Sequence, residues 1–212
     1  LSLIPAIATS CNGYFCWGLY YMIGARQKYG SVQKAMNTWR DYMVSMGFGY
    51  QLGIDLPGEK RGMIPNAQYY DKAYRRSWNG LTIISISIGQ GEVTATPLQI
   101  ANLGATIANR GYFVTPHVVK EIEGESIDSI YTTRRYTKVD KGHYEEVVQG
   151  MRSAVLGGTC RTANIPELEI CGKTGTAQNH GKDHSAFMGF APMNNPKIAI
   201  AVYVETGTTK SF

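Results

Sequence analysis

The residues whose types and order most clearly suggest chemistry are Lys173, Thr174, Gly175 and Thr176. Lys173 supplies a positive charge. Thr174 and Thr176 are two residues apart, so in an extended strand both hydroxyls project to the same face and can bind one anionic group. Gly175, and Gly172 just before the lysine, lack side chains that would hold a ligand backbone away. The segment is a candidate anion site on a strand edge, and its alternative interpretation is an ordinary basic edge strand.

Histidines and cysteines give no comparable group. His180 and His184 have a His-x-x-x-His spacing with Asp183 beside them, but Gly181 favours a polar hairpin loop over a helix that would align two metal ligands. The cysteines, at positions 11, 16, 160 and 171, have no Cys-x-x-Cys spacing, which argues against a zinc site and a disulfide framework. We therefore predict no metal and no other cofactor, and we expect free, mostly buried thiols.

Composition sets the broad class of the protein. The chain has 212 residues, of which 43% are hydrophobic and 17% charged, which is enough apolar mass for one globular domain or a large part of one. No run approaches the ~18 consecutive apolar residues that a membrane span requires, so the chain itself is expected to be soluble. The net charge of +5 favours anionic surroundings, but the arginine pairs at 75–76 and 134–135 are isolated, and no nucleic-acid site is predicted.

Helical periodicity predicts the elements in the first half of the chain that must position these residues. Apolar residues at helical spacing predict a helix over residues 14–28 and another over 32–46. Ser31 is the expected N-cap of the second helix and Gly47 its stop. Its expected buried stripe consists of Val32, Met36, Trp39 and Met43.

Two further helices and a short strand are predicted in the middle of the chain. Thr96-Pro97-Leu98-Gln99 has the features of a helix start, because a Thr cap is followed by Pro and then by Gln three residues after the cap. Gly111 ends this helix, and a strand is expected over residues 112–119. A fourth helix is predicted from residue 140 or 141 to the glycines at 157–158, with Val147, Met151, Ala154 and Val155 facing inward.

Three strands are predicted in the last part of the chain, over residues 169–178, 185–191 and 197–205. The turn residues 193–196, Met-Asn-Asn-Pro, predict that the second and third strands form a hairpin. Residues 198–204 are apolar at nearly every position, which is typical of a strand covered on both faces by helices.

Several segments, taken in order, resemble the transpeptidase domain of monofunctional (class B) penicillin-binding proteins, and the resemblance spans nearly the whole chain. Ser10-Cys11-Asn12 is similar to the S-x-N motif of that family, and Lys173-Thr174-Gly175 to its K-T-G motif. The segments similar to the family's framework are Gly53-Ile54-Asp55-Leu56-Pro57-Gly58-Glu59, Ser87-Ile88-Gly89-Gln90-Gly91, the Thr96 helix start and Gly189-Phe190-Ala191-Pro192. The glutamine at position 90 resembles the elongation-type branch of the family, penicillin-binding protein 2, whereas division-type relatives more often have an aromatic residue at this position.

The resemblance implies an α+β fold, an antiparallel sheet flanked by helices, as in penicillin-binding proteins and serine β-lactamases. Residues 1–212 are expected to form the C-terminal part of one transpeptidase domain, without the upstream nucleophile helix, the first strands and the C-terminal helix of the family. The sequence begins without Met and ends just after a strand, so we expect a piece of a longer protein. Apolar surface around residues 198–204 is then expected to be exposed or covered by another copy.

The activity implied by the resemblance is that of a serine-type D,D-transpeptidase. An upstream Ser attacks the D-Ala-D-Ala amide of a peptidoglycan stem peptide, releases D-Ala, and passes the acyl group to the amine of a neighbouring peptide. β-Lactams mimic D-Ala-D-Ala and acylate the same Ser. Because the S-x-x-K motif that supplies this Ser precedes S-x-N by dozens of residues in the family, it is expected outside this chain, which alone is expected to be inactive.

The resemblance also implies roles for residues that the chain contains. Ser10 would relay a proton to the leaving amine, and Asn12 would hold a substrate amide, although alone they would be interpreted as a helix cap and a turn residue. Lys173 would raise the positive potential, and the Thr174 and Thr176 hydroxyls, beside Gly175, would bind the terminal carboxylate. The Thr176 backbone N–H would form half of the oxyanion hole.

One S-x-x-K match lies inside the chain, at Ser31-Val32-Gln33-Lys34. At about 100° per residue, Lys34 points almost opposite the apolar stripe of its predicted helix, so it is expected to face water. A lysine that acts as a base must be desolvated or lie near another cation. We therefore interpret Ser31 as a helix cap and not as a nucleophile.

Partners and location follow from the resemblance alone. It implies a membrane-anchored parent on the periplasmic side of the bacterial inner membrane, working with a lipid-II polymerase and cell-elongation proteins. Two alternatives stay open: a non-catalytic β-lactam sensor or scaffold of the same fold, and a serine β-lactamase. The β-lactamase needs a carboxylate placed for deacylation, and no Glu of the chain lies in a recognisable deacylation motif.

Overall fold

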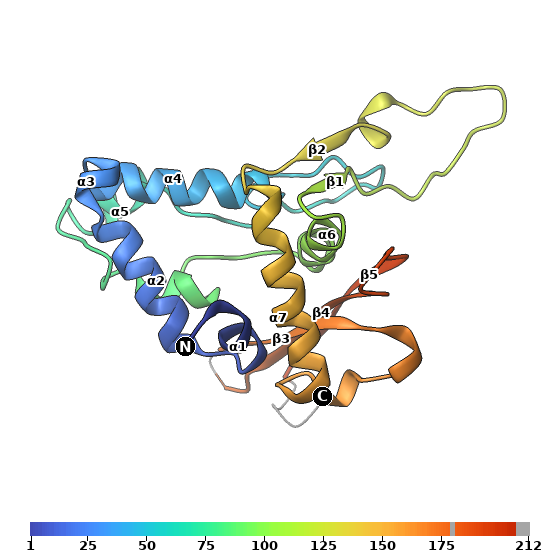
Figure 1. The fold of residues 1–212 in the computed structure, drawn as a ribbon. Helices are drawn as coiled ribbons and strands as arrows, with labels where there is room; N and C mark the ends of the chain where they lie inside the picture. Colours follow the sequence, from blue (N-terminus) through green and yellow to red (C-terminus); the bar gives the residue numbers. More distant parts are fainter. Residues whose placement is uncertain (179–180, 207–212) are drawn as a thin grey trace.

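The computed structural model describes residues 1–178 and 181–206 and combines helices with antiparallel strands, as predicted (Figure 1). The α-helices are α1 (Leu3–Ala8), α2 (Asn12–Gly24), α3 (Arg26–Tyr29), α4 (Val32–Ser45), α5 (Ala67–Ala73), α6 (Pro97–Ala108) and α7 (Tyr144–Gly157). The strands are β1 (Tyr112–Val114), β2 (Arg134–Tyr136), β3 (Cys171–Ala177), β4 (His184–Ala191) and β5 (Ile198–Val204). Among the 3₁₀ turns, η1 (Ile84–Ile88) and η4 (Arg161–Ala163) lie next to the candidate site.

The three predicted C-terminal strands are confirmed and form one antiparallel sheet in the order β3-β4-β5. Thr174 of β3 is opposite Phe187 of β4, which is opposite Val202 of β5. The β4–β5 hairpin turns at residues 192–197, as predicted. In the described sheet β3 is an edge strand, so one side of its backbone is open to other partners.

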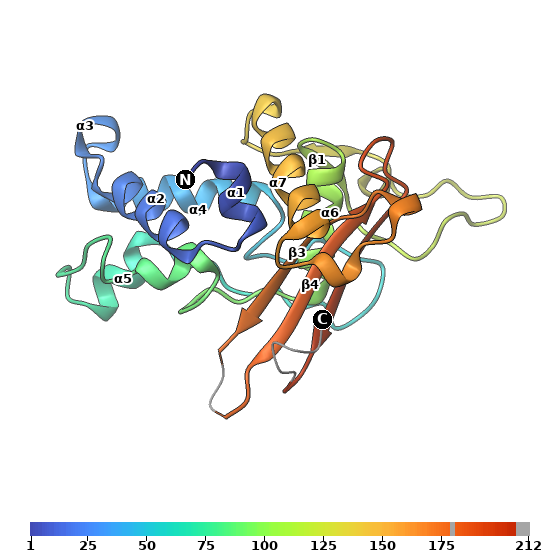
Figure 2. The same cartoon turned by 60° about the horizontal axis from the view of Figure 1, so that its bottom comes forward.

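One face of this sheet is covered by α1, α6 and α7 (Figure 2). The sheet side chains on this covered face come from alternate residues of the strands, namely Cys171, Met188, Phe190 and Ala199. They pack against Ile7 of α1, Ile107 of α6, and Tyr144, Val148 and Met151 of α7. On α6, Gly104 lets the helix approach closely, because an added Cβ would lie 3.3 Å from Met188 Cγ.

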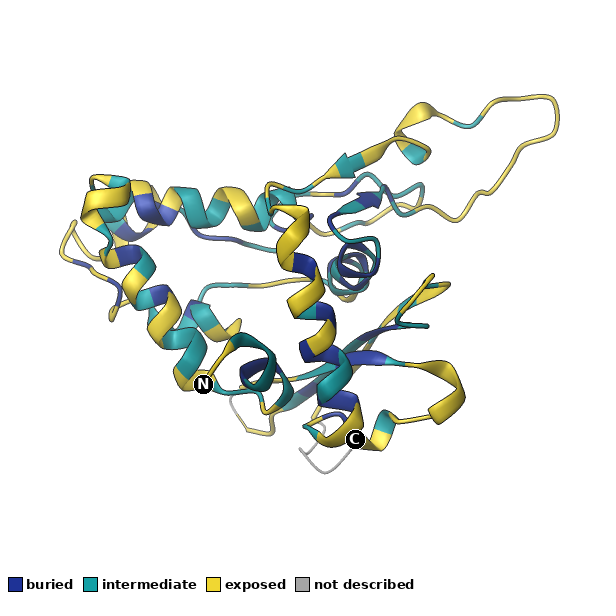
Figure 3. Cartoon of the chain, viewed as in Figure 1, coloured by how far each residue is buried: buried dark blue, intermediate teal, exposed yellow. Residues whose placement is uncertain are grey.

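The opposite face of the sheet is largely open (Figure 3). Ile198 is 60% exposed, and Ile200, Val202 and Val204 on the same face of β5 are also exposed. The prediction that helices cover both faces of β5 is therefore wrong for the described residues. An apolar run identifies a strand, but it does not say which partner covers each face. The expectation of exposed apolar surface around residues 198–204 is confirmed.

The helices α2, α4 and α5 share a second core with η1, built around Leu19, Ile23, Met36, Tyr70 and Ile83. The predicted helix over residues 32–46 and its Ser31 cap are confirmed. The predicted helix over residues 14–28 is divided in two, because Ala25 leaves helical geometry with ψ 67°. No described helix has the length and apolarity that crossing a membrane requires.

The start of α6 has the predicted capping box. Thr96 Oγ1 accepts from the Gln99 backbone N–H, and Gln99 Oε1 accepts from the Thr96 N–H. The predicted fourth helix begins at Tyr144, because residues 141–143 form a 3₁₀ turn. Its inward residues Met151, Ala154 and Val155 are buried, and Val147 is half-buried.

The strand predicted over residues 112–119 ends at Val114. Pro116 has no N–H to donate to a ladder, and further along the Asp55 carboxylate accepts hydrogen bonds from the Val118 and Val119 backbone N–H groups at 2.8–3.0 Å. Those groups are then unavailable to a strand ladder. The chain beyond leaves the body as a long arm before it returns as β2 (Figure 1).

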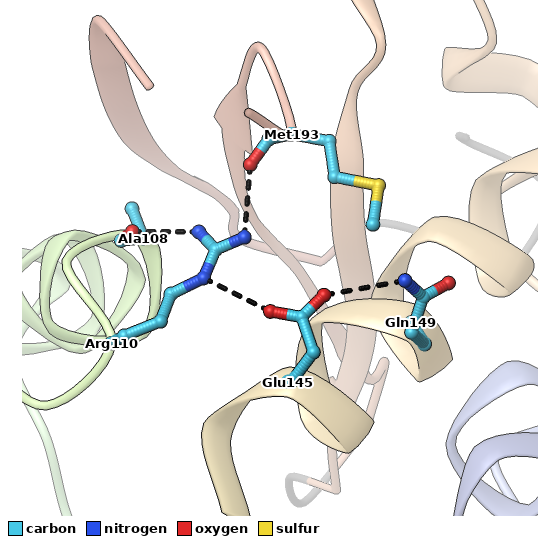
Figure 4. Close-up of polar contacts among 5 residues, drawn as sticks. All are labelled: Ala108, Arg110, Glu145, Gln149 and Met193. Carbon is cyan, nitrogen blue, oxygen red and sulfur yellow. Dashed lines mark hydrogen bonds and ion pairs between the residues drawn. The ribbon is translucent and has the colours of Figure 1, made fainter. Parts of the chain in front are cut away.

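Arg110, just after α6, joins three parts of the sheet layer (Figure 4). Its guanidinium donates to the Ala108 carbonyl at 2.8 Å and to the Met193 carbonyl at 3.1 Å, and it lies 3.4 Å from the Glu145 carboxylate. The Arg110 side chain is only 18% exposed. It therefore ties the end of α6 to α7 and to the β4–β5 turn.

Candidate functional site

The position of Ser10 is set by the packing of α1 against α7. Ile7 of α1 is buried against Gly150, where an added Cβ would lie 2.8 Å from Ile7 Cβ. At the end of α7, a Cβ added to Gly158 would clash with the Ala8 carbonyl oxygen, which accepts a hydrogen bond from the Thr159 N–H at 3.1 Å. Gly150 of α7 and Gly158, the residue just after it, thus form a close seat for α1.

Ser10 follows α1 in a left-handed backbone conformation, with φ 54°. Its N–H donates to the Ile7 carbonyl, and the Cys11 N–H donates to the Ala6 carbonyl at 2.9 Å, which closes the turn. A non-glycine residue in this conformation is uncommon and often marks a functional site. The same turn starts α2 at Asn12, whose side chain is exposed.

Lys173 reaches Ser10 from the edge strand. Its Nζ donates to Ser10 Oγ at 2.8 Å and to the Thr174 carbonyl at 2.8 Å. Burial of the ammonium lowers the pKa of Lys173 from its ordinary value. Because Ser10 Oγ accepts from Lys173, its own hydroxyl hydrogen stays available for another acceptor. Two residues from opposite ends of the chain, both predicted for the site, therefore form one polar contact.

The two threonine hydroxyls project from the other face of β3. The register places Thr174 and Thr176 on the face that carries Phe187, as predicted from their spacing, whereas Lys173 lies on the face of Met188. Thr174 Oγ1 donates to Thr159 Oγ1 at 3.2 Å. The hollow beside Thr174, of about 290 Å³, is lined by Cys160, Thr162, Ala163, Phe187 and Val202. It opens on the bare face of the sheet and not at the Ser10–Lys173 contact.

The backbone of β3 presents a second feature at its free edge. The Thr176 carbonyl accepts a hydrogen bond from Gln90 Nε2 at 2.7 Å, and the Thr174 carbonyl accepts from Lys173, so both carbonyls point away from β4. In an antiparallel ladder the N–H and C=O of one residue point to the same side. The Thr176 N–H is therefore also directed to the free edge.

Two residues of this site, Gln90 and Thr159, are not among the predicted site residues. Gln90 lies between Gly89 and Gly91, which adopt φ 73° and 68°. Two glycines around a polar residue point to a special loop there, and the family resemblance of residues 87–91 marks the segment as framework without giving Gln90 a role in the site. Thr159 has no comparable signal, because its role depends on the path of the chain after α7.

The internal S-x-x-K match is confirmed as a helix cap. Ser31 Oγ accepts from the Lys34 backbone N–H at 3.2 Å, and the Lys34 side chain is exposed. The ammonium is therefore solvated and does not lie against the hydroxyl as a base would.

The predictions on cysteines and metals have mixed outcomes. The thiols are free, and Cys160 and Cys171 are buried, whereas Cys11 and Cys16 are only half-buried. Burial raises the pKa of the Cys171 thiol to about 11, so it is inert at neutral pH. Within residues 1–178 and 181–206 no three His, Cys, Asp or Glu side chains gather as metal ligands. His180 lies outside the described residues.

Comparison with known proteins places this geometry in a family. Residues 2–212 match the family model described as "Penicillin binding protein transpeptidase domain". Peptidoglycan D,D-transpeptidase MrdA of Acinetobacter baumannii is 38% identical over 98% of this chain, which covers 32% of that protein. The crystal structure of Pseudomonas aeruginosa PBP2 in complex with WCK 5153 is 35% identical, with a TM-score of 0.81 over 98% of this chain and 45% of that one.

A second similar structure contains a partner protein. The complex between PBP2 and MreC from Helicobacter pylori is 28% identical, with a TM-score of 0.77 over 98% of this chain and 36% of that one. The chain thus spans about a third of the length of the curated relative and less than half of each solved chain.

Proposed function

Because this chain belongs to the penicillin-binding protein transpeptidase domain family, we propose that the protein containing it is a peptidoglycan D,D-transpeptidase of the PBP2 (MrdA) type. The observation that carries the proposal is the hydrogen bond between Lys173 Nζ and Ser10 Oγ. It joins a cation and a hydroxyl beside an open strand edge, which suits acyl transfer on a peptide with an anionic end.

In the proposed reaction a serine hydroxyl attacks the carbonyl carbon between the two D-alanines of a stem peptide. The new ester bond forms as the C–N bond breaks, and the leaving D-Ala amine takes up a proton. The amine of a neighbouring stem peptide then attacks the ester, a new amide bond forms, and the serine regains its proton. No redox step or cofactor is required.

Ser10 and Lys173 would serve the proton transfers and the charge of this reaction. Ser10 would pass a proton to the leaving amine, because its hydroxyl accepts from Lys173 and keeps a hydrogen to donate. Lys173 would hold the Ser10 oxygen in place and raise the local positive potential. The lysine is half-buried, so its charge is less screened than a surface charge.

The remaining residues would hold the substrate. The Thr176 N–H, directed to the free edge, would donate to the developing oxyanion, and losing one such donor typically costs about 3–4 kcal/mol of transition-state stabilisation. Thr174 and Thr176 would bind the terminal carboxylate, with Gly175 keeping the edge clear. Asn12, exposed at the start of α2, would hold a substrate amide.

The acylated serine would come from a part of the protein outside these 212 residues. Two observations support this: the chain spans about a third of a curated relative, and Ser31 already acts as the cap of α4. We propose that residues 1–212 form the C-terminal part of one transpeptidase domain. β-Lactams would acylate the same external serine.

Partners and location are proposed from the relatives. A solved PBP2 is bound to MreC, which supports assembly of this protein with cell-elongation proteins, and a lipid-II polymerase would supply the glycan strands. The protein would be anchored in the inner membrane and act on its periplasmic side.

The test is acylation of the full-length protein by a fluorescent penicillin, together with release of D-Ala from a stem-peptide donor. Covalent labelling with D-Ala release that depends on an acceptor amine would support a transpeptidase. Labelling without turnover would favour a sensor or scaffold, and rapid nitrocefin hydrolysis would favour a serine β-lactamase. Absence of labelling would contradict the proposal.

A further inference from the structure

Two hydrogen bonds connect the helical part of the molecule to the free edge of β3. One joins Ser10 to Lys173, and the other joins Gln90 to the carbonyl of Thr176, three residues further along the strand. Gln90 and the turn at Ser10 belong to one packed unit, because η1 contacts α2 and Ser87 Oγ lies 3.3 Å from Cys16 Sγ. The helical part of the molecule therefore contacts the edge of β3 at two points, through Ser10 and through Gln90.

The loop that carries Gln90 is held by backbone hydrogen bonds, and the Gln90 side chain is half-buried. The Gly89 and Gln90 N–H groups donate to the carbonyls of Ile86 and Ser85. At Gly91, an added Cβ would lie 2.5 Å from Ser85 Oγ, and the residue has a positive φ, so only glycine fits. Because the loop backbone is fixed, we expect the hydrogen bond to Thr176 to open by rotation of the Gln90 side chain.

The Thr176 carbonyl is also the acceptor that an added peptide strand needs. A strand that pairs with an exposed sheet edge exchanges both backbone hydrogen bonds with the residue opposite, one to its N–H and one to its C=O. Gln90 already donates to that C=O at 2.7 Å. A peptide or β-lactam whose amide N–H is directed to this carbonyl must therefore compete with the Gln90 side chain.

Resting on the proposed function, we propose that Gln90 is a latch on the substrate edge of β3: its side-chain amide occupies the Thr176 carbonyl and is displaced when a ligand pairs there. Gln90 is then a positioning residue that selects among ligands. Ligands with an amide N–H beside the reactive carbonyl compete with the latch. Ligands without this N–H do not.

The test compares two β-lactams on the full-length protein and its variants Gln90→Leu and Gln90→Glu, neither of which can donate to the Thr176 carbonyl. Benzylpenicillin has an acylamino N–H, and imipenem has a hydroxyethyl group instead. The readout is the ratio of the second-order acylation rates of the two ligands. Gln27→Leu, at an exposed position on α3, is the matched control.

Release of one hydrogen bond should raise the benzylpenicillin-to-imipenem ratio by roughly 2- to 10-fold in both Gln90 variants and leave it unchanged in Gln27→Leu. A purely structural role would change both rates together and keep the ratio constant, which would overturn the latch. A fall in the ratio would also overturn it, because Gln90 would then assist the ligand. If neither ligand acylates the wild-type protein, the proposed transpeptidase function is wrong, and this outcome differs from a constant or falling ratio, which overturns only the role of Gln90.

Discussion

Lys173 Nζ donates a hydrogen bond to Ser10 Oγ at 2.8 Å, which joins an edge strand near the end of the chain to a turn near its start. Neither residue is placed by its own segment alone. Ser10 depends on the seat of α1 on α7, and Lys173 depends on the pairing of β3 with β4. The Ser10–Lys173 hydrogen bond therefore depends on the packing of α1 against α7 and on the pairing of β3 with β4 together.

Replacing Lys173 tests its role in acylation. Lys173→Met in the full-length protein should reduce the second-order rate of penicillin acylation by about 100-fold or more, because a preorganised donor and a positive charge are both lost. The measurement is stopped-flow or gel-based labelling, with circular dichroism to establish that the variant is folded. A loss of less than about threefold would contradict a direct role of the lysine.

The pH dependence of acylation should report the titration of Lys173. Burial lowers its pKa below 10.5, and only the protonated form attracts a carboxylate, so the acylation rate should be full below this lowered pKa and fall as pH rises through it. The free energy of unfolding should move in the opposite direction, rising between the lowered pKa and 10.5, because the unfolded chain then binds more protons. Lys173→Met should lack both trends. An alkaline limb that persists in Lys173→Met would assign it to another group.

Ser31→Ala separates a helix cap from a nucleophile. Loss of the hydrogen bond from the Lys34 N–H should lower the free energy of unfolding by about 1 kcal/mol, and penicillin labelling of the full-length protein should be unchanged. Urea unfolding and fluorescent labelling measure the two effects. If labelling disappears while the variant remains folded, Ser31 is the acylated serine and our interpretation of α4 is wrong.

The elements with local signals could be predicted from the sequence. The capping box at Thr96 and the Ser31 cap lie within a few residues of one another, so their geometry follows from local order. The three C-terminal strands follow from their apolar runs and the turn between the last two. The pairing of Ser10 with Lys173 required the family resemblance, because no local pattern connects residues so far apart.

The contacts that the sequence could not predict are those made by the tertiary path of the chain. Thr174 binds Thr159 only because the segment after α7 returns beside β3, and Gln90 binds Thr176 across 86 residues. The break at Ala25 is similar, since no proline in the sequence marks the point at which the backbone turns. A periodic hydrophobic pattern identifies a helix or a strand. It carries no information on which distant helix or strand packs against a given face.

Gly158→Ala tests the seat that positions Ser10. The added methyl would meet the Ala8 carbonyl and the Ala154 Cα, both backbone atoms that cannot rotate away. We expect a loss of about 2 kcal/mol or more in the free energy of unfolding, together with slower acylation as Ser10 moves relative to Lys173. Gly157→Ala is the matched control, because nothing lies within 4 Å of an added Cβ there and alanine has a higher helix propensity than glycine. Equal effects of the two substitutions would refute the seat.

Arg110→Met tests the polar junction that holds α6, α7 and the β4–β5 turn together. The substitution keeps the apolar stem but removes the donor to the Ala108 and Met193 carbonyls and the ion pair with Glu145, whose carboxylate keeps its hydrogen bond from Gln149. Because the side chain is only 18% exposed, water replaces these bonds poorly, and we expect a loss of about 2 kcal/mol or more in urea unfolding. Lys138→Met removes a more exposed ion pair, between Lys138 and Asp41, and should cost less than about 1 kcal/mol. The side chains of these two residues are 59% and 55% exposed. Since both substitutions remove one positive charge, a difference between them reports burial and geometry, and similar small losses would mean that Arg110 does not brace the sheet.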